Sequence, residues 1–248
     1  MNRHLKAIFS AIGFLTIIPI KNQTITPTTT AYFPIAGLFL GAILILLNFI
    51  LSQFMLPHII ITALLLVVYI ILTGGLHIDG LSDTVDGIAA SDKDKAEILA
   101  MMSDSHIGAE GVIAIVCDTL LKFALLYIIP NKVFQNVLLT FPTISRWAMV
   151  ISMLVSHPAK DTGVGKLFIE STNLLNSIIA SLICIAISIF VFPTVITLII
   201  IGTTGLVTIC VTKFFARKVG GMTGDTIGAV NELVEIVSLM IFVIIYGK

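Results

Sequence analysis

Residues 174–192, LLNSIIASLICIAISIFVF, form a run of 19 residues without a single charged side chain. A helix needs about 20 mostly apolar residues to cross the roughly 30 Å hydrocarbon core of a bilayer. The run at 194–212, TVITLIIIGTTGLVTICVT, has the same character, and Pro193 between the two is typical of a tight turn. The pattern predicts two consecutive transmembrane helices.

Similar runs occur along most of the chain, at 31–56, 58–76, 107–129, 133–157, 174–192, 194–212 and 229–246. Of the 248 residues, 57% are hydrophobic and 11% are charged, whereas soluble domains carry about 25% charged residues. No recurring strand-length alternation indicates a β-barrel. The fold class is therefore expected to be all-α, a polytopic membrane protein with about seven transmembrane helices in one domain over residues 1–248.

The first 30 residues differ from the later spans. Their apolar segment, 5–20, has only about 16 residues and contains Pro19, so we expect an interfacial or re-entrant segment. Its basic start is typical of a signal peptide, but no small-x-small cleavage site follows. We expect it to stay in the mature chain.

Lysine and arginine fall mainly on one side of the predicted spans. The side of the N-terminus carries ten of them and the opposite side two: Arg3, Lys6, Lys21, Lys93, Lys95, Lys160, Lys166, Lys213, Arg217 and Lys218 against Lys132 and Lys248. The positive-inside rule makes the first side cytoplasmic. The long polar connections, 77–106, 158–173 and 213–228, then lie on the cytoplasmic face, where we expect the active site. The zero net charge excludes a nucleic-acid partner.

Residues 74–87, GGLHIDGLSDTVDG, hold the most informative cluster of acids. On a helix, Asp79, Asp83 and Asp86 have i, i+4 and i+7 spacing and project from one face. Carboxylates gathered this way favour a hard cation such as Mg²⁺. We predict them as metal ligands and His77 as an orienting residue or substrate contact. Downstream, Asp92, Asp94 and Glu97 alternate with lysines, which is typical of a solvated surface.

A second polar block is MSDSHIG at 102–108. Asp104 is a candidate fourth metal ligand, while Ser103 or Ser105 is equally suited to cap the next helix. The role of His106 stays open between substrate contact and surface residue.

A third block, GGMTGDT at 220–226, precedes the last span. A glycine-rich turn that enters a helix presents backbone N–H groups to a phosphate. This interpretation makes Gly221, Thr223, Gly224 and Asp225 candidate substrate contacts; the alternative is a flexible loop with a helix cap. Glu232 lies within an apolar segment and is expected to face a cavity or a partner.

Three more charges lie inside predicted spans. Asp118 and Lys122, at i and i+4, can form an intramembrane ion pair, with structural and functional roles equally open. Arg146 is predicted to contact a substrate phosphate.

Together these blocks resemble the cobalamin synthase family, the adenosylcobinamide-GDP ribazoletransferases. The resemblance covers nearly the whole chain and also includes YFPIAGLFLG at 32–41, SR at 145–146 and GVGKLFIE at 163–170. One departure is His106, where the family commonly has arginine; a neutral histidine would hold a phosphate more weakly.

The resemblance implies a Mg²⁺-dependent enzyme of a bacterial or archaeal cytoplasmic membrane. Such an enzyme joins adenosylcobinamide-GDP to α-ribazole or its 5′-phosphate and releases GMP, late in cobalamin biosynthesis. It implies metal-binding roles for Asp79, Asp83, Asp86 and Asp104, and catalytic roles for the last three. Substrate contacts would come from His77, Ser105, His106, Arg146, Lys166, Glu232 and the 220–226 loop. The prediction allows a homo-oligomer in the lipid bilayer.

Two other classes remain as rivals. A membrane CDP-alcohol phosphotransferase also uses Mg²⁺ and clustered aspartates, but the motif of that family requires an Ala-Arg pair where this chain has Ile88-Ala89-Ala90. A transporter with a cation site would favour charges at mid-membrane and inverted repeats. No such repeat is visible in the sequence.

Overall fold

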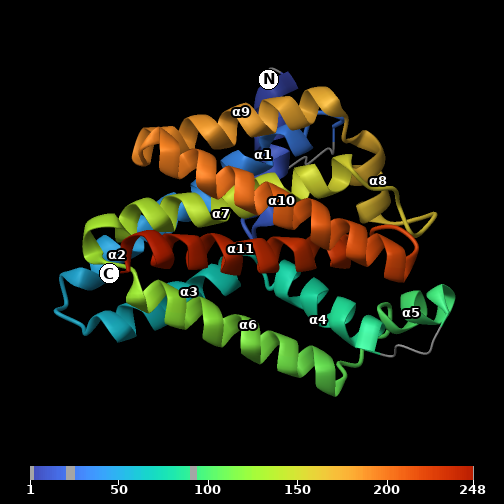
Figure 1. Ribbon diagram of the computed structural model, residues 1–248, viewed down its shortest axis with the longest axis horizontal. Helices are drawn as coiled ribbons and strands as arrows, with labels where there is room; N and C mark the ends of the chain where they lie inside the picture. The colour runs from blue at the N-terminus through green and yellow to red at the C-terminus, as the bar shows by residue number, and fades with distance from the viewer. Residues whose placement is uncertain (1–2, 21–25, 90–93, 248) are drawn as a thin grey trace.

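The computed structural model describes residues 3–20, 26–89 and 94–247 and consists of helices packed side by side (Figure 1). The predicted surface charges Lys21, Asp92, Lys93 and Lys248 lie outside the described residues. Within these described residues, six helices are long and apolar enough to cross a membrane. They are α2 (Phe33–Ser52), α6 (Ala109–Ile128), α7 (Asn131–Leu154), α9 (Leu174–Val191), α10 (Thr194–Val219) and α11 (Gly224–Tyr246). The all-α, multi-pass prediction is confirmed.

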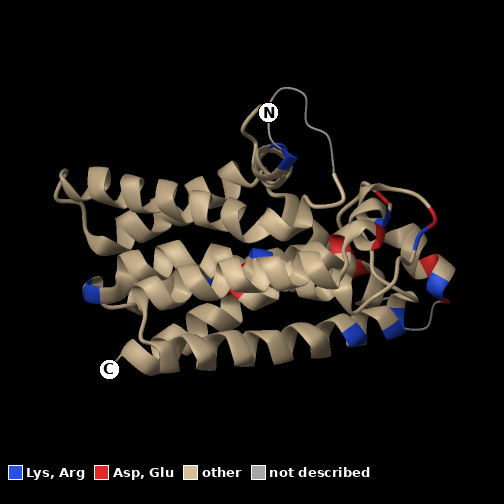
Figure 2. Cartoon of the chain, turned by 90° about the horizontal axis from the view of Figure 1, so that it is seen from above, with Lys and Arg blue, Asp and Glu red and all other residues tan. Residues whose placement is uncertain are grey.

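The shorter helices lie between these spans or before them. They are α1 (Arg3–Leu15), the 3-10 turn η1 (Thr30–Tyr32), α3 (His58–Leu72), α4 (Leu76–Ala89), α5 (Lys95–Met101) and α8 (Val164–Ser171). Helix α1 lies across the bundle and is seen end-on in Figure 2, where the long helices run side to side. The interfacial placement of this segment stays a prediction.

The span expected at 58–76 ends early, because its helix stops at Leu72 and a bend follows. Helix α3 has only 15 residues, and α4 leaves it at an angle of 83°. Gly74 and Gly75 make this bend with φ of +63° and +69°, in the left-handed region that residues with a Cβ seldom adopt. Helices α3 and α4 add a seventh membrane crossing only if the two are counted together as one broken span. Hydropathy detected the apolar run but not the bend inside it.

We expect Gly75→Ala to lower the free energy of unfolding by about 1–2 kcal/mol, because alanine is strained at this φ. An added Cβ would come no closer than 3.8 Å to Ile78 Cγ2, so the cost is conformational rather than steric. Gly202→Ala in α10 is the matched control, since its Cβ meets nothing within 4 Å. Thermal unfolding in detergent should show a lower midpoint only for Gly75→Ala; equal midpoints for both variants would contradict this account of the bend.

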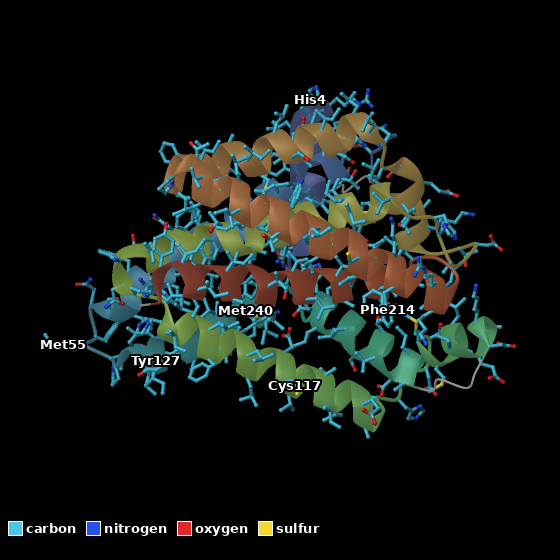
Figure 3. All side chains as sticks on the ribbon, viewed as in Figure 1. His4, Met55, Cys117, Tyr127, Phe214 and Met240 are labelled. Atoms are coloured by element: carbon cyan, nitrogen blue, oxygen red, sulfur yellow. The ribbon has the colours of Figure 1, made fainter. Side chains whose placement is uncertain are left out.

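Charged and apolar side chains are distributed as expected for a protein in lipid. Large apolar side chains on the outer helices are exposed, Phe190 at 90% and Leu182 at 63% among them. Cys117 and Tyr127 lie at the outer edge of the bundle in Figure 3. The interior, by contrast, holds a group of charged residues described below. This pattern supports the membrane assignment independently of helix length.

Helix α7 is the central element of the bundle, because most of its residues are buried by the neighbouring helices. It packs against α2 through Gly37 and Gly41. A Cβ at Gly37 would lie 2.6 Å from Thr143 Cα, and a Cβ at Gly41 would lie 2.7 Å from Leu139 Cα. Small residues that let two backbones touch are typical of helix contacts in membranes. The other side of α7 faces α11, which contacts α4 in turn.

Candidate active site

Most of the charged residues outside the bundle core gather at one end of the molecule (Figure 2), around α4, α5, α8 and the loops that join them. The opposite end has short turns, such as the one between α9 and α10. The polar end is therefore where a charged substrate can be bound.

Helix α4 presents the predicted acidic face. It is helical from Leu76 to Ala89, so Asp79, Asp83 and Asp86 share one side as their spacing predicted. Partial burial, together with the neighbouring charges of Asp79, Asp225 and Asp86, raises the pKa of the Asp83 carboxyl to about 6. The Lys160 ammonium opposes this shift only in part. Negative charge is thus concentrated at Asp83.

Asp86 has a contact that its spacing did not predict. Its carboxylate oxygens accept hydrogen bonds from the backbone N–H groups of Gly108 (2.8 Å) and Gly111 (2.7 Å) at the start of α6. An acid at a helix N-terminus satisfies free N–H groups and favours the helix dipole. Asp86 therefore fastens α4 to α6, and its predicted metal and catalytic roles stay predictions.

The 220–226 block begins α11 and is rigidly held. Thr223 caps the helix through a reciprocal pair of hydrogen bonds with Thr226. Before it, Met222 N–H donates to His157 O (2.8 Å), and Ala159 N–H donates to Met222 O (2.9 Å). The helix cap of the alternative interpretation is therefore present, with Thr223 as the N-cap, and the predicted phosphate contacts of this block stay predictions. Gly221, at φ +144°, packs against the Ala159 backbone.

Asp225 lies directly against the acidic helix. A Cβ on Gly80 of α4 would lie 2.8 Å from Asp225 O and 2.9 Å from its Cα, so only glycine allows this approach. The contact brings the third sequence block to the first. Asp79, Asp83 and Asp225 consequently form one negatively charged region.

A cavity of about 360 Å³ opens beside this region. Its polar lining combines predicted and unpredicted residues: His77, Asp79, Lys160, Thr162, Lys166, Thr223, Gly224 and Asp225. Its apolar lining comes from α1, α2, α4, α7, α8, α11 and the residue Met222 before α11, namely Phe14, Phe33, Leu76, Met149, Met153, Val164, Phe168, Met222 and Ile227. A cavity with an apolar wall and a few convergent charges is typical of a small-molecule site.

Lys160 is the functional candidate that sequence reasoning missed. Its ammonium group donates to Ser103 Oγ (2.7 Å) and is close enough to Asp83 and Asp225 to lower the pKa of the Asp83 carboxyl. The sequence showed it only as one of ten cytoplasmic charges. Lys166, which was predicted, also lines the cavity and lies 3.7 Å from Glu170.

The second predicted block lies outside the cavity. Asp104, Ser105 and His106 are exposed and do not line it. His106 Nδ1 is 2.7 Å from Asp104 Oδ1, and the His106 backbone N–H donates to the same oxygen at 3.0 Å. These hydrogen bonds lower the pKa of Asp104. The predicted roles of Asp104, Ser105 and His106 in metal and substrate binding stay predictions, and none of the three contacts the cavity.

Arg146 and Glu232 lie in a buried ionic network, and their predicted substrate contacts stay predictions. Arg146 is completely buried and its Nη1 donates to Glu235 (2.5 Å) and to the Tyr69 hydroxyl. Glu232 accepts from Lys122, which also lies 2.7 Å from Glu235 and 3.1 Å from Asp118. The predicted Asp118–Lys122 pair is thus present within a larger network.

His77 connects this network to the cavity. Its ring Nδ1 lies 3.4 Å from Arg146 Nη2, and the residue lines the cavity as well. Through His77 the network fixes the first turn of α4. Arg146 and Glu232 can therefore position the site without touching a substrate.

The donor set fits magnesium in one specific way. Within the described ranges, no group of three or more His, Cys, Asp or Glu side chains is arranged to hold a metal ion by itself. Mg²⁺ usually binds one or two carboxylates and completes its shell with water and substrate phosphates. The carboxylates of Asp79 and Asp83, next to a cavity lined by lysines, match that requirement.

The raised pKa of Asp83 has a consequence for stability. Helix α4 is not among the six membrane-spanning helices, and an unperturbed Asp83 would titrate near 3.8 rather than about 6. An acid with a raised folded-state pKa destabilises the fold while ionised; this effect is complete above about pH 6 and is lost as the pH falls toward 4. Asp83→Asn should therefore raise the unfolding temperature of metal-free protein at pH 8 and change it little at pH 4.

Scanning fluorimetry in EDTA at the two pH values checks this expectation. A variant that is less stable than the wild type at pH 8 would show that Asp83 supports the fold instead.

Comparison with known proteins places these features in a family context. The family model of cobalamin-5-phosphate synthase matches residues 7–243. No solved structure is significantly similar to the chain.

Curated relatives share the chain from end to end. Proteins named adenosylcobinamide-GDP ribazoletransferase from Thermoanaerobacter pseudethanolicus and Caldanaerobacter subterraneus are both 38% identical to it, over 245 and 248 residues. These alignments cover 96% and 97% of the chain and 97% and 99% of the relatives. A protein of the same name from Fusobacterium nucleatum is 32% identical, with 97% of the chain and 98% of the relative covered.

Proposed function

The chain belongs to the cobalamin-5-phosphate synthase family, and on that premise we propose that it is a membrane-bound adenosylcobinamide-GDP ribazoletransferase. It joins adenosylcobinamide-GDP to α-ribazole or its 5′-phosphate. A hydroxyl oxygen of the acceptor bonds to the phosphorus that carries cobinamide. The bond from this phosphorus to the bridging oxygen breaks, GMP leaves with that oxygen, and the hydroxyl proton passes to a base.

One observation carries this proposal: Asp79 of α4, the capped start of α11 with Asp225, and two lysines line a single cavity. Phosphoryl-type transfer asks a protein mainly for positioning and charge neutralisation. The ammonium groups of Lys160 and Lys166 can hold phosphate oxygens. Backbone N–H groups at the start of α11 favour the same charge.

We further propose that Asp79 and Asp83 hold Mg²⁺, with Asp225 beside them. Bound there, the ion would neutralise charge on the diphosphate. The proton of the acceptor hydroxyl needs a carboxylate that does not hold the ion, and Asp225, which lines the cavity beside the two ligands, suits this task better than Asp86. Both Asp86 oxygens already accept backbone hydrogen bonds.

The orientation follows from the same end of the molecule. Lys160, Lys166 and the basic end of α10, with Arg217 and Lys218, lie on the side of the cavity. With the positive-inside rule, these charges support our proposal that the cavity opens at the cytoplasmic face of a cytoplasmic membrane. This agrees with a water-soluble nucleotide donor and a water-soluble nucleoside or nucleotide acceptor.

The test uses purified protein in liposomes with Mg²⁺, adenosylcobinamide-GDP and α-ribazole 5′-phosphate. We expect release of GMP together with a new corrinoid product, and loss of both in EDTA. Product formation that persists in EDTA would keep the transferase assignment and remove magnesium. Absence of product from folded protein, with turnover of a CDP-alcohol substrate instead, would replace the assignment.

A further inference from the structure

The cavity has an aromatic wall that the charge-based account of the site leaves unused. Phe14 of α1, Phe33 of α2 and Phe168 of α8 meet there: the ring centroids of Phe14 and Phe168 are 4.5 Å apart, and those of Phe33 and Phe168 are 5.5 Å apart. Met149 and Met153 of α7 extend the wall. All but Phe14 are almost completely buried.

We propose that this wall binds the aromatic base of the acceptor nucleoside. The inference rests on the proposed function and assigns one of its two substrates to a place. The acceptor's base would lie against Phe168 and Phe33, and its ribosyl group would point toward Asp225 and Asp79.

Size supports the acceptor as the occupant. A cavity of about 360 Å³ is at the lower end of the range for small-molecule sites, roughly 300–1,000 Å³. A nucleoside fits this volume, whereas a corrin macrocycle does not. The corrinoid part of the donor must then lie outside the cavity, with only its diphosphate reaching the acids.

The chemistry of the wall favours the base of ribazole over guanine. Guanine carries several hydrogen-bonding groups on its edges, and burying them without partners is costly. The phenylalanine and methionine side chains of the wall offer none. The base of ribazole is a dimethylbenzimidazole whose benzo ring and methyl groups are apolar, so it loses little on entering such a wall. Aromatic stacking and contacts to methionine sulfur add attraction.

The arrangement also gives α1 a function. This helix lies across the bundle, and Phe14 in its last turn reaches the cavity from outside the group of spanning helices. Backbone N–H of Ile17, just after α1, donates to Leu72 O (2.8 Å) beside the α3–α4 bend. The segment that composition marked as too short to span thus closes one side of the binding cavity.

The first experiment measures KM for each substrate separately in proteoliposomes. Phe168→Leu should raise the KM for α-ribazole about 10-fold, the scale of a lost stacking contact, and leave the KM for adenosylcobinamide-GDP unchanged. Phe141→Leu is the matched control: it is equally buried and packs on Tyr69, 5.2 Å between centroids, but does not line the cavity. A rise in the donor KM instead would place guanine at the wall and overturn the proposal.

A second experiment needs no variant. With wild-type protein, a riboside of adenine should have a KM at least about 10-fold above that of a dimethylbenzimidazole riboside. Equal values would contradict an apolar base site.

Equilibrium dialysis of labelled α-ribazole separates this proposal from the proposed function. Binding to wild-type protein that Phe168→Leu weakens, without turnover, would keep the base site and reject the transferase. Turnover with an unchanged acceptor KM in Phe168→Leu would keep the transferase assignment and reject the base site. If wild-type protein neither binds α-ribazole nor turns it over, both proposals are rejected.

Discussion

Asp83→Asn is expected to lower kcat for ribazole transfer by about 10²- to 10³-fold, the usual cost of removing one electrostatic contact to a transition state. Asp83 interacts electrostatically with Asp79 and Asp225, which line the cavity, and asparagine has the same shape without the charge that holds a cation. Initial rates of GMP release at saturating substrates measure the change.

Asp94→Asn is the control for this prediction. Asp94 is exposed and caps α5 by accepting from the backbone N–H of Glu97 (2.9 Å), a role that asparagine also fills. We expect wild-type kcat for it. An Asp83→Asn enzyme with wild-type kcat would remove the α4 acids from catalysis. Together with the gain in metal-free stability expected at pH 8, a loss of rate would mark Asp83 as a residue kept for function.

Lys122→Met is expected to have the largest effect on stability, about 3–5 kcal/mol in the free energy of unfolding. Lys122 is buried among Asp118, Glu232 and Glu235 and is the shared cation of all three. Its removal leaves these acids with Arg146 alone, in a region where water cannot solvate them. Thermal or denaturant unfolding in detergent measures the loss.

Two further variants test the cause of that loss. Lys132→Met, at the exposed start of α7, should leave stability unchanged. Glu232→Gln in the Lys122→Met background should recover part of the stability by removing one uncompensated charge. A single variant Lys122→Met as stable as the wild type would show that the network contributes nothing to the fold.

Sequence patterns predicted the spans well because each depends on local composition. The apolar runs gave the spanning helices to within a few residues at most ends, and the i, i+4, i+7 spacing placed the acids of α4 on one face. The division at Gly74 and Gly75 escaped this reasoning, because hydropathy contains no information on φ.

The partners of buried charges could not be predicted from spacing. Arg146 and Glu232 were expected to contact substrate, yet their partners, Glu235 and Lys122, come from other helices. Lys160 and the aromatic wall were missed for the same reason: Phe14 and Phe168 are 154 residues apart in sequence and meet only through tertiary packing. Asp225 was found because its glycine-rich block is a local signal.

The most direct test of this account is a structure of the protein in nanodiscs with Mg²⁺ and a non-hydrolysable analogue of adenosylcobinamide-GDP. The account predicts density for the diphosphate between Asp79 and Asp83 of α4 and the start of α11, within reach of Lys160 and Lys166, with the corrin ring outside the cavity. A diphosphate bound at Asp104 and His106, away from that cavity, would contradict it.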